Sequence, residues 1–330
     1  MLSQPVEQAA QLSLMGRIVV SAIAMASLSC TDSTEPGPRE VPEVAIAPIA
    51  PGQILFFEND GGYAIHVANS SGARVSRISP QGSLDIDPAV SRDGKRIAYS
   101  GAPPNGDWDI YVMNADGTNR IQLTSSRGSD NRPTWSPDGN RIAFASERDL
   151  TSSQIYVMNA DGTGVARLTG PVGSHGSPEW SPDGKLILFD RDAHGWENKG
   201  IFVMNSDGSN VRQLTSGHFE KYPSWSPDGT RIAFVRETPG GRELFVMNAD
   251  GSGAKQLTSG IASVSDPTWS PDGTSIAFGF TSRSKMCVDD YFGDGSSSYP
   301  CGLDVRRVSL DGVIDPNWIL SSASNPAWQR

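Results

Sequence analysis

The chain has 330 residues, enough for one large domain with additional segments, and it contains 35 glycines and 23 prolines. That abundance suits short strands joined by many turns. The formal net charge is −10 and no run of lysine or arginine occurs, which argues against nucleic acid as a partner because phosphate backbones are bound by clustered positive charge. No apolar run reaches the roughly 20 residues that a membrane-spanning helix requires.

Residues 1–29 are predicted to be an export signal. Arg17 precedes a short apolar run, Ile18–Leu28, which is typical of a signal peptide rather than of a membrane helix. The residues upstream carry Glu7 and no positive charge, so Met15 is favoured as the true start of translation.

The signal ends in Ser27-Leu28-Ser29-Cys30, which resembles a bacterial lipoprotein signal, whose cysteine carries the lipid. The usual pattern has leucine where Ser27 stands, and Ala24-Met25-Ala26 offers an alternative site for ordinary cleavage. We therefore expect an exported protein, in the periplasm or on the outer surface, with a membrane tether through lipid on Cys30 as the leading interpretation. The proline-rich residues 30–51 would form an extended tether.

An internal repeat dominates the rest of the chain. The segment Pro133-Thr-Trp-Ser-Pro-Asp-Gly-Asn-Arg-Ile-Ala-Phe144 recurs from Pro178, Pro223 and Pro267, and a weaker copy starts at Pro88. The turn glycines that set a period of 44–45 residues are Gly94, Gly139, Gly184, Gly229 and Gly273. A second motif, Ile110–Gly117, recurs at Ile155–Gly162, Ile201–Gly208 and Leu244–Gly251. Such a period indicates a repeat architecture.

Each period is predicted to hold four short strands, a to d. Strand a is Pro-x-Trp, and the Ser-Pro-Asp-Gly turn leads to strand b. Strand c ends in the Asn-x-Asp-Gly hairpin turn before strand d. A four-stranded meander of this length buries its faces by stacking radially, as a propeller blade. The repeated tryptophans are expected to pack between blades.

Residues 52–330 are thus predicted to form an all-β, six-bladed β-propeller. The chain ends in a strand a, Asn325–Trp328, and the domain begins with a strand b near Ile54. The N- and C-terminal strands would therefore share one blade and close the ring. Five further blades would start at Pro88, Pro133, Pro178, Pro223 and Pro267.

These repeats resemble the TolB-like, WD40-like propeller repeat (the PD40 family) over nearly everything after residue 51. The resemblance implies a propeller fold, and it is less specific for function, because the family includes scaffolds, receptors and the propeller halves of peptidases. No Gly-x-Ser-x-Gly nucleophile motif occurs. Residues 30–51 are too few for the N-terminal domain of full TolB, which places TolB's partner, the peptidoglycan-associated lipoprotein, in doubt.

The a–b and c–d turns are nearly identical, whereas the predicted loops between strands b and c all differ: Gly101–Asp109, Glu147–Gln154, Arg191–Gly200, Arg236–Glu243 and the long Phe280–Asp304. We therefore expect ligands on the face that carries the b–c and d–a loops. The residues just before each Pro-x-Trp are predicted to rim the central channel and bind the ligand: Asp85, Asp87, Asp130, Arg132, His175, Glu220, Lys221, Tyr222, Asp266 and Asn325. Ordinary solvation of loop ends is the alternative.

The leading function is a non-catalytic cell-envelope protein, most simply a monomer without a cofactor, that binds a protein or another envelope ligand. The alternative is a metal-dependent carbohydrate-active enzyme, a lyase or hydrolase, with a metal held in the channel by His175, His194 and His218. Cys287 and Cys301 are predicted to form a disulfide, because exported proteins meet an oxidising compartment. Two free buried thiols are the alternative.

Overall fold

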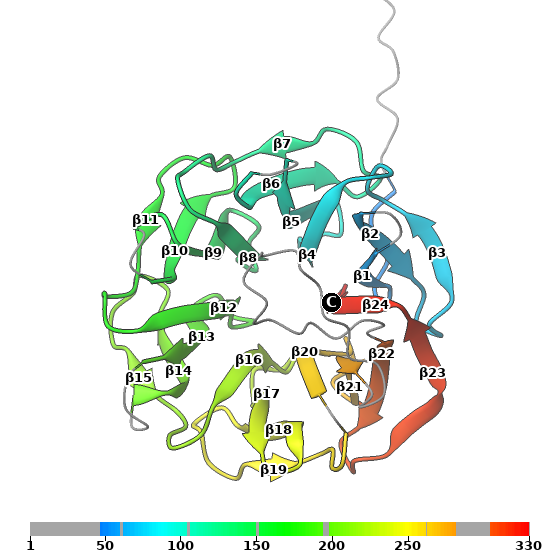
Figure 1. The fold of residues 1–330 in the computed structure, drawn as a ribbon, viewed down its shortest axis with the longest axis vertical. Helices are drawn as coiled ribbons and strands as arrows, with labels where there is room; N and C mark the ends of the chain where they lie inside the picture. The colour runs from blue at the N-terminus through cyan, green and yellow to red at the C-terminus, as the bar shows by residue number, and fades with distance from the viewer. Residues whose placement is uncertain are drawn as a thin grey trace, which may run out of the picture. The chain divides into compact units, whose positions relative to one another are not determined.

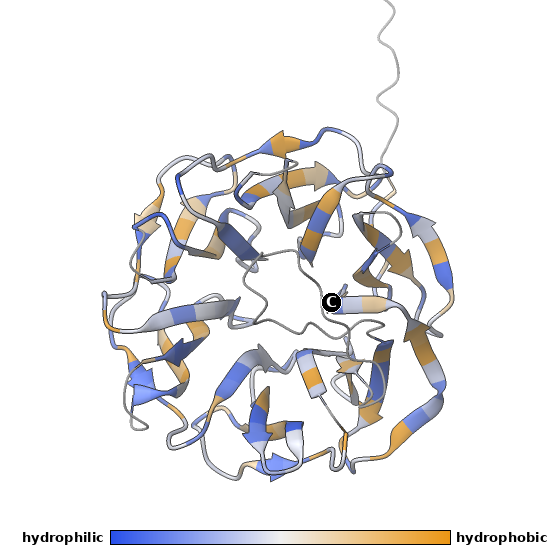
Figure 2. Ribbon diagram, in the orientation of Figure 1, coloured by the Kyte–Doolittle hydropathy of each residue, from blue (hydrophilic) through white to orange (hydrophobic). Residues whose placement is uncertain are grey.

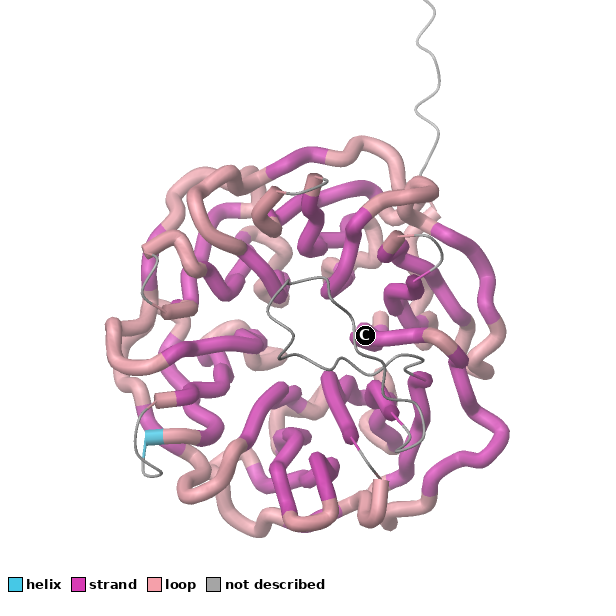
Figure 3. The backbone as a smooth tube through the Cα atoms, viewed as in Figure 1, coloured by secondary structure: helices cyan, strands magenta, loops and turns pink. Residues whose placement is uncertain are grey.

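Short strands make up nearly all of the regular structure. The computed structural model describes residues 47–59, 62–103, 106–149, 152–193, 198–261, 263–281 and 304–329. Apart from helical backbone at Asn198, these residues form strands, turns and loops (Figure 3). No helix in the described ranges is long and apolar enough to cross a membrane.

The described strands form five sheets, which are arranged around a common centre (Figure 1). One sheet has eight strands: β1 (Ile54–Asn59), β2 (Tyr63–Ala68), β3 (Arg74–Arg77), β4 (Leu84–Val90), β5 (Arg96–Ala102), β6 (Asp109–Asn114), β7 (Ile121–Gln122) and β24 (Ala323–Trp328).

The other four sheets have four strands each. The first contains β8 (Asp130–Trp135), β9 (Arg141–Ser146), β10 (Gln154–Asn159) and β11 (Ala166–Arg167); the second contains β12 (Ser174–Trp180), β13 (Leu186–Asp192), β14 (Gly200–Asn205) and β15 (Arg212–Gln213). The third contains β16 (Glu220–Trp225), β17 (Arg231–Thr238), β18 (Gly241–Asn248) and β19 (Lys255–Gln256); the fourth contains β20 (Ser263–Trp269), β21 (Ser275–Thr281), β22 (Asp304–Ser309) and β23 (Ile314–Ser321).

The all-β propeller is therefore confirmed, but the prediction of six separate blades was wrong. The described residues form four separate four-stranded blades and one double-width sheet. In that sheet the meanders β24-β1-β2-β3 and β4-β5-β6-β7 are joined by one parallel pairing, Tyr63 with Leu84. A single backbone contact of this kind is invisible in the repeat pattern.

The two ends of the domain pair with each other. Strand β24 lies antiparallel to β1, with Ile54 opposite Trp328, and so supplies the innermost strand of the meander that β1 begins. The incoming chain is held on the a–b turn side, where the Ile49 N–H donates to the Gly94 carbonyl at 2.8 Å. The ring is thus closed by the pairing of the first strand, β1, with the last strand, β24.

Tryptophans carry much of the packing between sheets. In β4, hydrophobic and hydrophilic residues alternate from Leu84 to Asp87 (Figure 2), and the buried residue there is Asp85 rather than its apolar neighbours. Successive sheets are bound by tryptophans of the inner strands: the guanidinium of Arg96 lies 4.4 Å from the ring of Trp135, and that of Arg141 lies 4.6 Å from Trp180. Both tryptophans are buried. The repeated tryptophans therefore pack between neighbouring sheets, as predicted.

Candidate functional site: a channel rimmed by six backbone bulges

Each inner strand of the ring has the same irregularity. In β12, Gly176 pairs with Asp190 and Glu179 with Leu188, so three steps along one strand face two along the other. This is a β-bulge, and the other inner strands show the same shift. The bulge falls on a residue followed by proline, and proline has no N–H to lose from the ladder.

The residue before the proline has positive φ in every case. We name these residues the bulge ring: Asp87, Arg132, Ser177, Tyr222, Asp266 and Asn325, with φ between 45° and 57°. Positive φ is uncommon for residues other than glycine and costs on the order of 1–3 kcal/mol. Six equivalent strained positions that carry polar side chains of five kinds point to a site rather than to a packing motif.

The bulge ring opens onto a central cavity with a volume of about 440 Å³, lined by the inner strands β4, β8, β12, β16, β20 and β24 (Figure 1). Below the ring comes a middle layer: Ala89, Thr134, Glu179, Ser224, Thr268 and Ala327. Each strand a runs from a d–a loop to an a–b turn, so the bulge ring lies towards the loop face. We call this cavity the channel.

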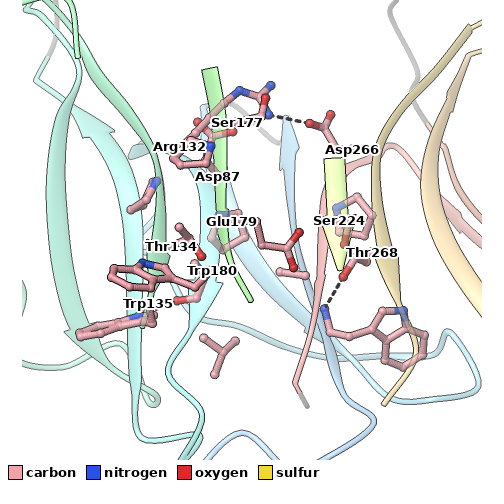
Figure 4. A pocket seen from close by; sticks show the side chains of 18 of the residues that line it. Asp87, Arg132, Thr134, Trp135, Ser177, Glu179, Trp180, Ser224, Asp266 and Thr268 are labelled. Atoms are coloured by element: carbon pink, nitrogen blue, oxygen red, sulfur yellow. Dashed lines mark hydrogen bonds and ion pairs between the residues drawn. The ribbon is translucent and has the colours of Figure 1, made fainter. Parts of the chain in front are cut away.

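A salt bridge spans the channel at the bulge ring. Arg132 on β8 donates from Nη1 to Oδ1 of Asp266 on β20 at 2.7 Å (Figure 4). Three steps separate β8 from β20 in the ring of six inner strands, so the pair joins opposite walls. The guanidinium also lies 4.6 Å from the ring of Tyr222. We call this pair the Arg132–Asp266 bar.

Neighbouring side chains hold the bar in place. The Ser100 hydroxyl accepts from the Arg132 backbone N–H at 3.1 Å and donates to Asp87 at 3.0 Å. Asn325 also donates to Asp87. Burial raises the pKa of the Asp87 carboxyl, while Arg132 acts in the opposite direction. Burial disfavours the charged form of Arg132, yet Asp266 and Asp87 raise its pKa overall, so the guanidinium stays charged.

The middle layer contains one charged residue, Glu179. Its Oε2 accepts the backbone N–H of Trp225 on the next inner strand at 3.2 Å. Thr268 makes the equivalent contact through its hydroxyl, which accepts the N–H of Trp328 at 3.5 Å (Figure 4). A hydroxyl therefore suffices for this contact between neighbouring strands.

The turn face differs from the loop face in how its polar groups are used. In each of the five a–b turns outside the seam, a serine hydroxyl donates to the aspartate two residues later, over 2.5–2.7 Å. In the turn at Asp228, bonds from Ser226 and Thr230 lower the carboxyl pKa to about 2. These aspartates stabilise their own turns, as the turn motif predicted.

Half of the predicted rim residues line the channel, and half do not. Asp87, Arg132, Tyr222, Asp266 and Asn325 do so. Ser177, which the prediction omitted, occupies the same repeat position and also lines it. The signal for Ser177 was present in the sequence, since it directly precedes Pro178.

The other half lie outside the lining of this cavity. The carboxylates among them are buried in ion pairs: Asp85 with Arg120 at 2.9 Å, Asp130 with Arg148 at 3.0 Å, and Glu220 with Arg236 at 2.6 Å. The ammonium of Lys221 lies 4.8 Å from the ring of Phe219. In a regular strand, residues i and i+2 point to the same face. The bulge after Ile86 breaks this rule, so Asp85 and Asp87 do not share surroundings.

The predicted metal-binding histidines lie in different surroundings. His175 is buried, 4 % exposed, with its ring 5.5 Å from that of Phe189. Burial and then Arg191 lower its pKa to about 4. His218 is exposed, and His194 lies outside the described residues. Among the described residues, no group of three histidine, cysteine, aspartate or glutamate side chains is placed to hold a metal.

Several other predicted features fall outside the described ranges: Cys30, Cys287, Cys301, the export signal and most of the Phe280–Asp304 loop. One predicted loop is mostly strand. From Arg236 to Glu243 the chain forms a tight hairpin, in which Glu237 pairs with Arg242 and Thr238 with Gly241.

The radial sheets, the ring closure and the channel define a β-propeller with a polar central channel. The chain belongs to the TolB β-propeller domain family (PD40), whose model matches residues 101–238 and 220–286. No curated protein matches the sequence.

Solved structures share the fold at low identity. TolB from Acinetobacter baumannii is 21% identical with a TM-score of 0.67, covering 84% of this chain and 66% of that one. A protein assigned as TolB from Agrobacterium tumefaciens is 20% identical with a TM-score of 0.64, covering 83% and 90%. Hydrazine synthase from Kuenenia stuttgartiensis is 16% identical with a TM-score of 0.63, covering 85% and 47%. At these identities the likeness concerns the fold alone.

Proposed function

We propose that this chain is a non-catalytic binding or scaffold protein of the cell envelope. It binds a protein partner, or another envelope ligand, through the loop face around the bulge ring. One observation carries the proposal: a single strained backbone geometry recurs on every inner strand and presents a polar side chain each time, of five kinds in all. Strain of this kind is typical of binding sites and is held by the surrounding sheets.

The contrast between the two faces supports the same assignment. On the turn face, the aspartates of the a–b turns are engaged by hydrogen bonds within their own turns. On the loop face, the bulge ring combines an arginine, two carboxylates, an amide, a hydroxyl and a phenol. Such a mixture fits a ligand with several polar groups, as a protein segment has.

The test compares one substitution on each face. The full-length chain would be used to retain partners from envelope extract, as the wild type and with Tyr222→Ala or Asp138→Asn. Tyr222 is in the bulge ring, and Asp138 is in a Ser-Pro-Asp-Gly turn. We expect Tyr222→Ala to reduce retention of a wild-type partner at least tenfold and Asp138→Asn to leave it unchanged. The reverse pattern would place the working surface on the turn face.

We further propose that the protein is exported as a monomer, that Cys30 carries a lipid, and that Cys287 and Cys301 form a disulfide. The sequence Ser29-Cys30 at the end of the apolar run and the cysteine pair in the Phe280–Asp304 loop support these assignments. Metabolic labelling with palmitate should mark the wild type and not Cys30→Ser. Labelling of both would assign the lipid elsewhere.

A further inference from the structure

Two cations share one aromatic ring on the loop face of the sheet that contains β16, β17 and β18. The ammonium of Lys221, near the start of β16, lies 4.8 Å from the centre of the Phe219 ring. The guanidinium of Arg242, in the β17–β18 hairpin, lies 5.9 Å from the same centre. The face of an aromatic ring attracts cations, so Phe219 positions both side chains. We name these three residues the basic patch; it borders the bulge ring, because Lys221 directly precedes Tyr222.

The cations of the basic patch lack the carboxylate partners that comparable arginines have. Within the described ranges, the charged groups of Lys221 and Arg242 donate no hydrogen bond and have no carboxylate within 4.0 Å. Their donors therefore remain available to a ligand. Three other arginines that lie against aromatic rings each pair with a buried carboxylate at 2.6–3.0 Å: Arg120 with Asp85, Arg148 with Asp130, and Arg236 with Glu220.

The carboxylates nearest to the patch leave its positive charge in place. Glu237 pairs with Arg242 across the hairpin, but its carboxylate oxygens stay more than 4.0 Å from the guanidinium. Asp190 is buried and accepts the backbone N–H of Tyr222 at 3.4 Å. Burial raises the pKa of the Asp190 carboxyl, while Lys221 acts in the opposite direction. In a chain with a net charge of −10, two adjacent cations without a carboxylate partner are an exception that the fold itself does not explain.

A carboxylate beside an apolar group is the ligand chemistry that the patch fits best. The planar guanidinium of Arg242 matches a carboxylate in a bidentate arrangement, and the ammonium of Lys221 provides further donors. Phe219 is half-buried, so it offers apolar surface next to the two cations. A nucleic acid would require a longer track of positive charge along its backbone than two side chains supply.

We propose that the basic patch binds an acidic segment of the partner protein, whose aspartate or glutamate carboxylates are held by Lys221 and Arg242 beside the ring of Phe219. The proposal rests on the proposed function in taking the loop face as the side of approach. It adds the chemistry of the partner and three residues that recognise it.

The test uses short peptides and the full-length chain. Acetyl-Glu-Phe-Glu-amide carries two carboxylates, and acetyl-Gln-Phe-Gln-amide is its neutral counterpart of nearly the same shape. Both would carry the same fluorophore, and binding would be followed by fluorescence anisotropy. We expect the acidic peptide to bind at least tenfold more tightly than the neutral one, a ratio equivalent to about 1.4 kcal/mol, and to bind more weakly as the salt concentration rises. Equal affinity of the two peptides, or tighter binding of an oligothymidylate, would overturn the proposal.

Charge-matched variants then locate the site. The double variant Lys221→Gln with Arg242→Gln removes both cations of the patch. The double variant Lys95→Gln with Arg92→Gln removes two exposed cations from an a–b turn on the opposite face, and it changes the net charge equally. We expect the first variant to weaken binding of the acidic peptide at least tenfold and the second to leave it unchanged. Equal weakening by the two would assign the binding to net charge and overturn the patch.

The outcomes separate this inference from the proposed function. Loss of discrimination between the two peptides, with partner retention still dependent on Tyr222, would refute the basic patch alone. Partner retention insensitive to Tyr222→Ala, with peptide binding that still depends on Lys221 and Arg242, would refute the role of the bulge ring and leave the basic patch standing.

Discussion

Asp130 tests whether the buried, ion-paired carboxylates outside the channel lining stabilise the fold. Its carboxylate is fully buried, accepts from Arg148 at 3.0 Å and from the Ser126 hydroxyl at 3.1 Å, and its Oδ1 has no hydrogen-bond partner among the described residues. Arg148→Met leaves this charge buried without its cation, which costs about 3–5 kcal/mol. It also removes the contact of the guanidinium with the ring of Tyr156 at 4.6 Å, worth about 1 kcal/mol.

An exposed pair supplies the comparison. In the ion pair of Arg167 with Asp149, the side chains are 30 % and 41 % exposed, so Arg167→Met should cost less than about 1 kcal/mol. Urea unfolding followed by tryptophan fluorescence measures both. The double variant Asp130→Asn with Arg148→Met should recover about 2 kcal/mol of the loss, because it removes the buried charge. Equal costs for the two arginine variants, or no recovery, would refute the reasoning.

Two further predictions concern stability. Because burial lowers the pKa of His175 from 6.5 to about 4, the unfolded chain binds more protons than the folded one between these values, so the free energy of unfolding should fall by about 3 kcal/mol as the pH drops from 6.5 to 4. Valine occupies the equivalent position of another repeat, Val264. His175→Val should therefore remove this part of the pH dependence, and an unchanged dependence of the free energy of unfolding on pH would show that His175 does not cause it. Trp328 is 7 % exposed and stacks on Trp318 at 5.9 Å, so Trp328→Ala should cost about 3–5 kcal/mol in urea unfolding, clearly more than the same change at half-buried Trp108; similar costs would argue against a role of the last strand in closing the ring.

The repeat made the architecture predictable. A period of 44–45 residues with two turn motifs predicted the meanders, and the split motif predicted that the first and last strands share a blade, where the structure pairs Ile54 with Trp328. These features depend on local turn chemistry and hydrophobic alternation, which the sequence displays directly. The pairing of Tyr63 with Leu84, which joins two meanders, has no such pattern and was missed.

The site was only half predictable, for a physical reason. The position before each proline was visible, but the bulge that turns Asp87 into the channel and leaves Asp85 with Arg120 depends on backbone dihedrals. The Arg132–Asp266 bar joins residues 134 positions apart, so only the closed ring reveals it. Glu179 also lines the channel, and the sequence does not mark it, because in the Pro-x-Trp motif that contains it only the tryptophan has a predicted role, as packing between blades.

The most direct measurement of the central claim is photo-crosslinking in intact cells from one position on each face. A photoreactive phenylalanine analogue would replace Tyr222 in the bulge ring or Asn140 beside the Asp138 turn, in the full-length chain. We expect a discrete crosslinked partner from position 222 and none from position 140. A partner crosslinked from position 140 and not from position 222 would contradict it.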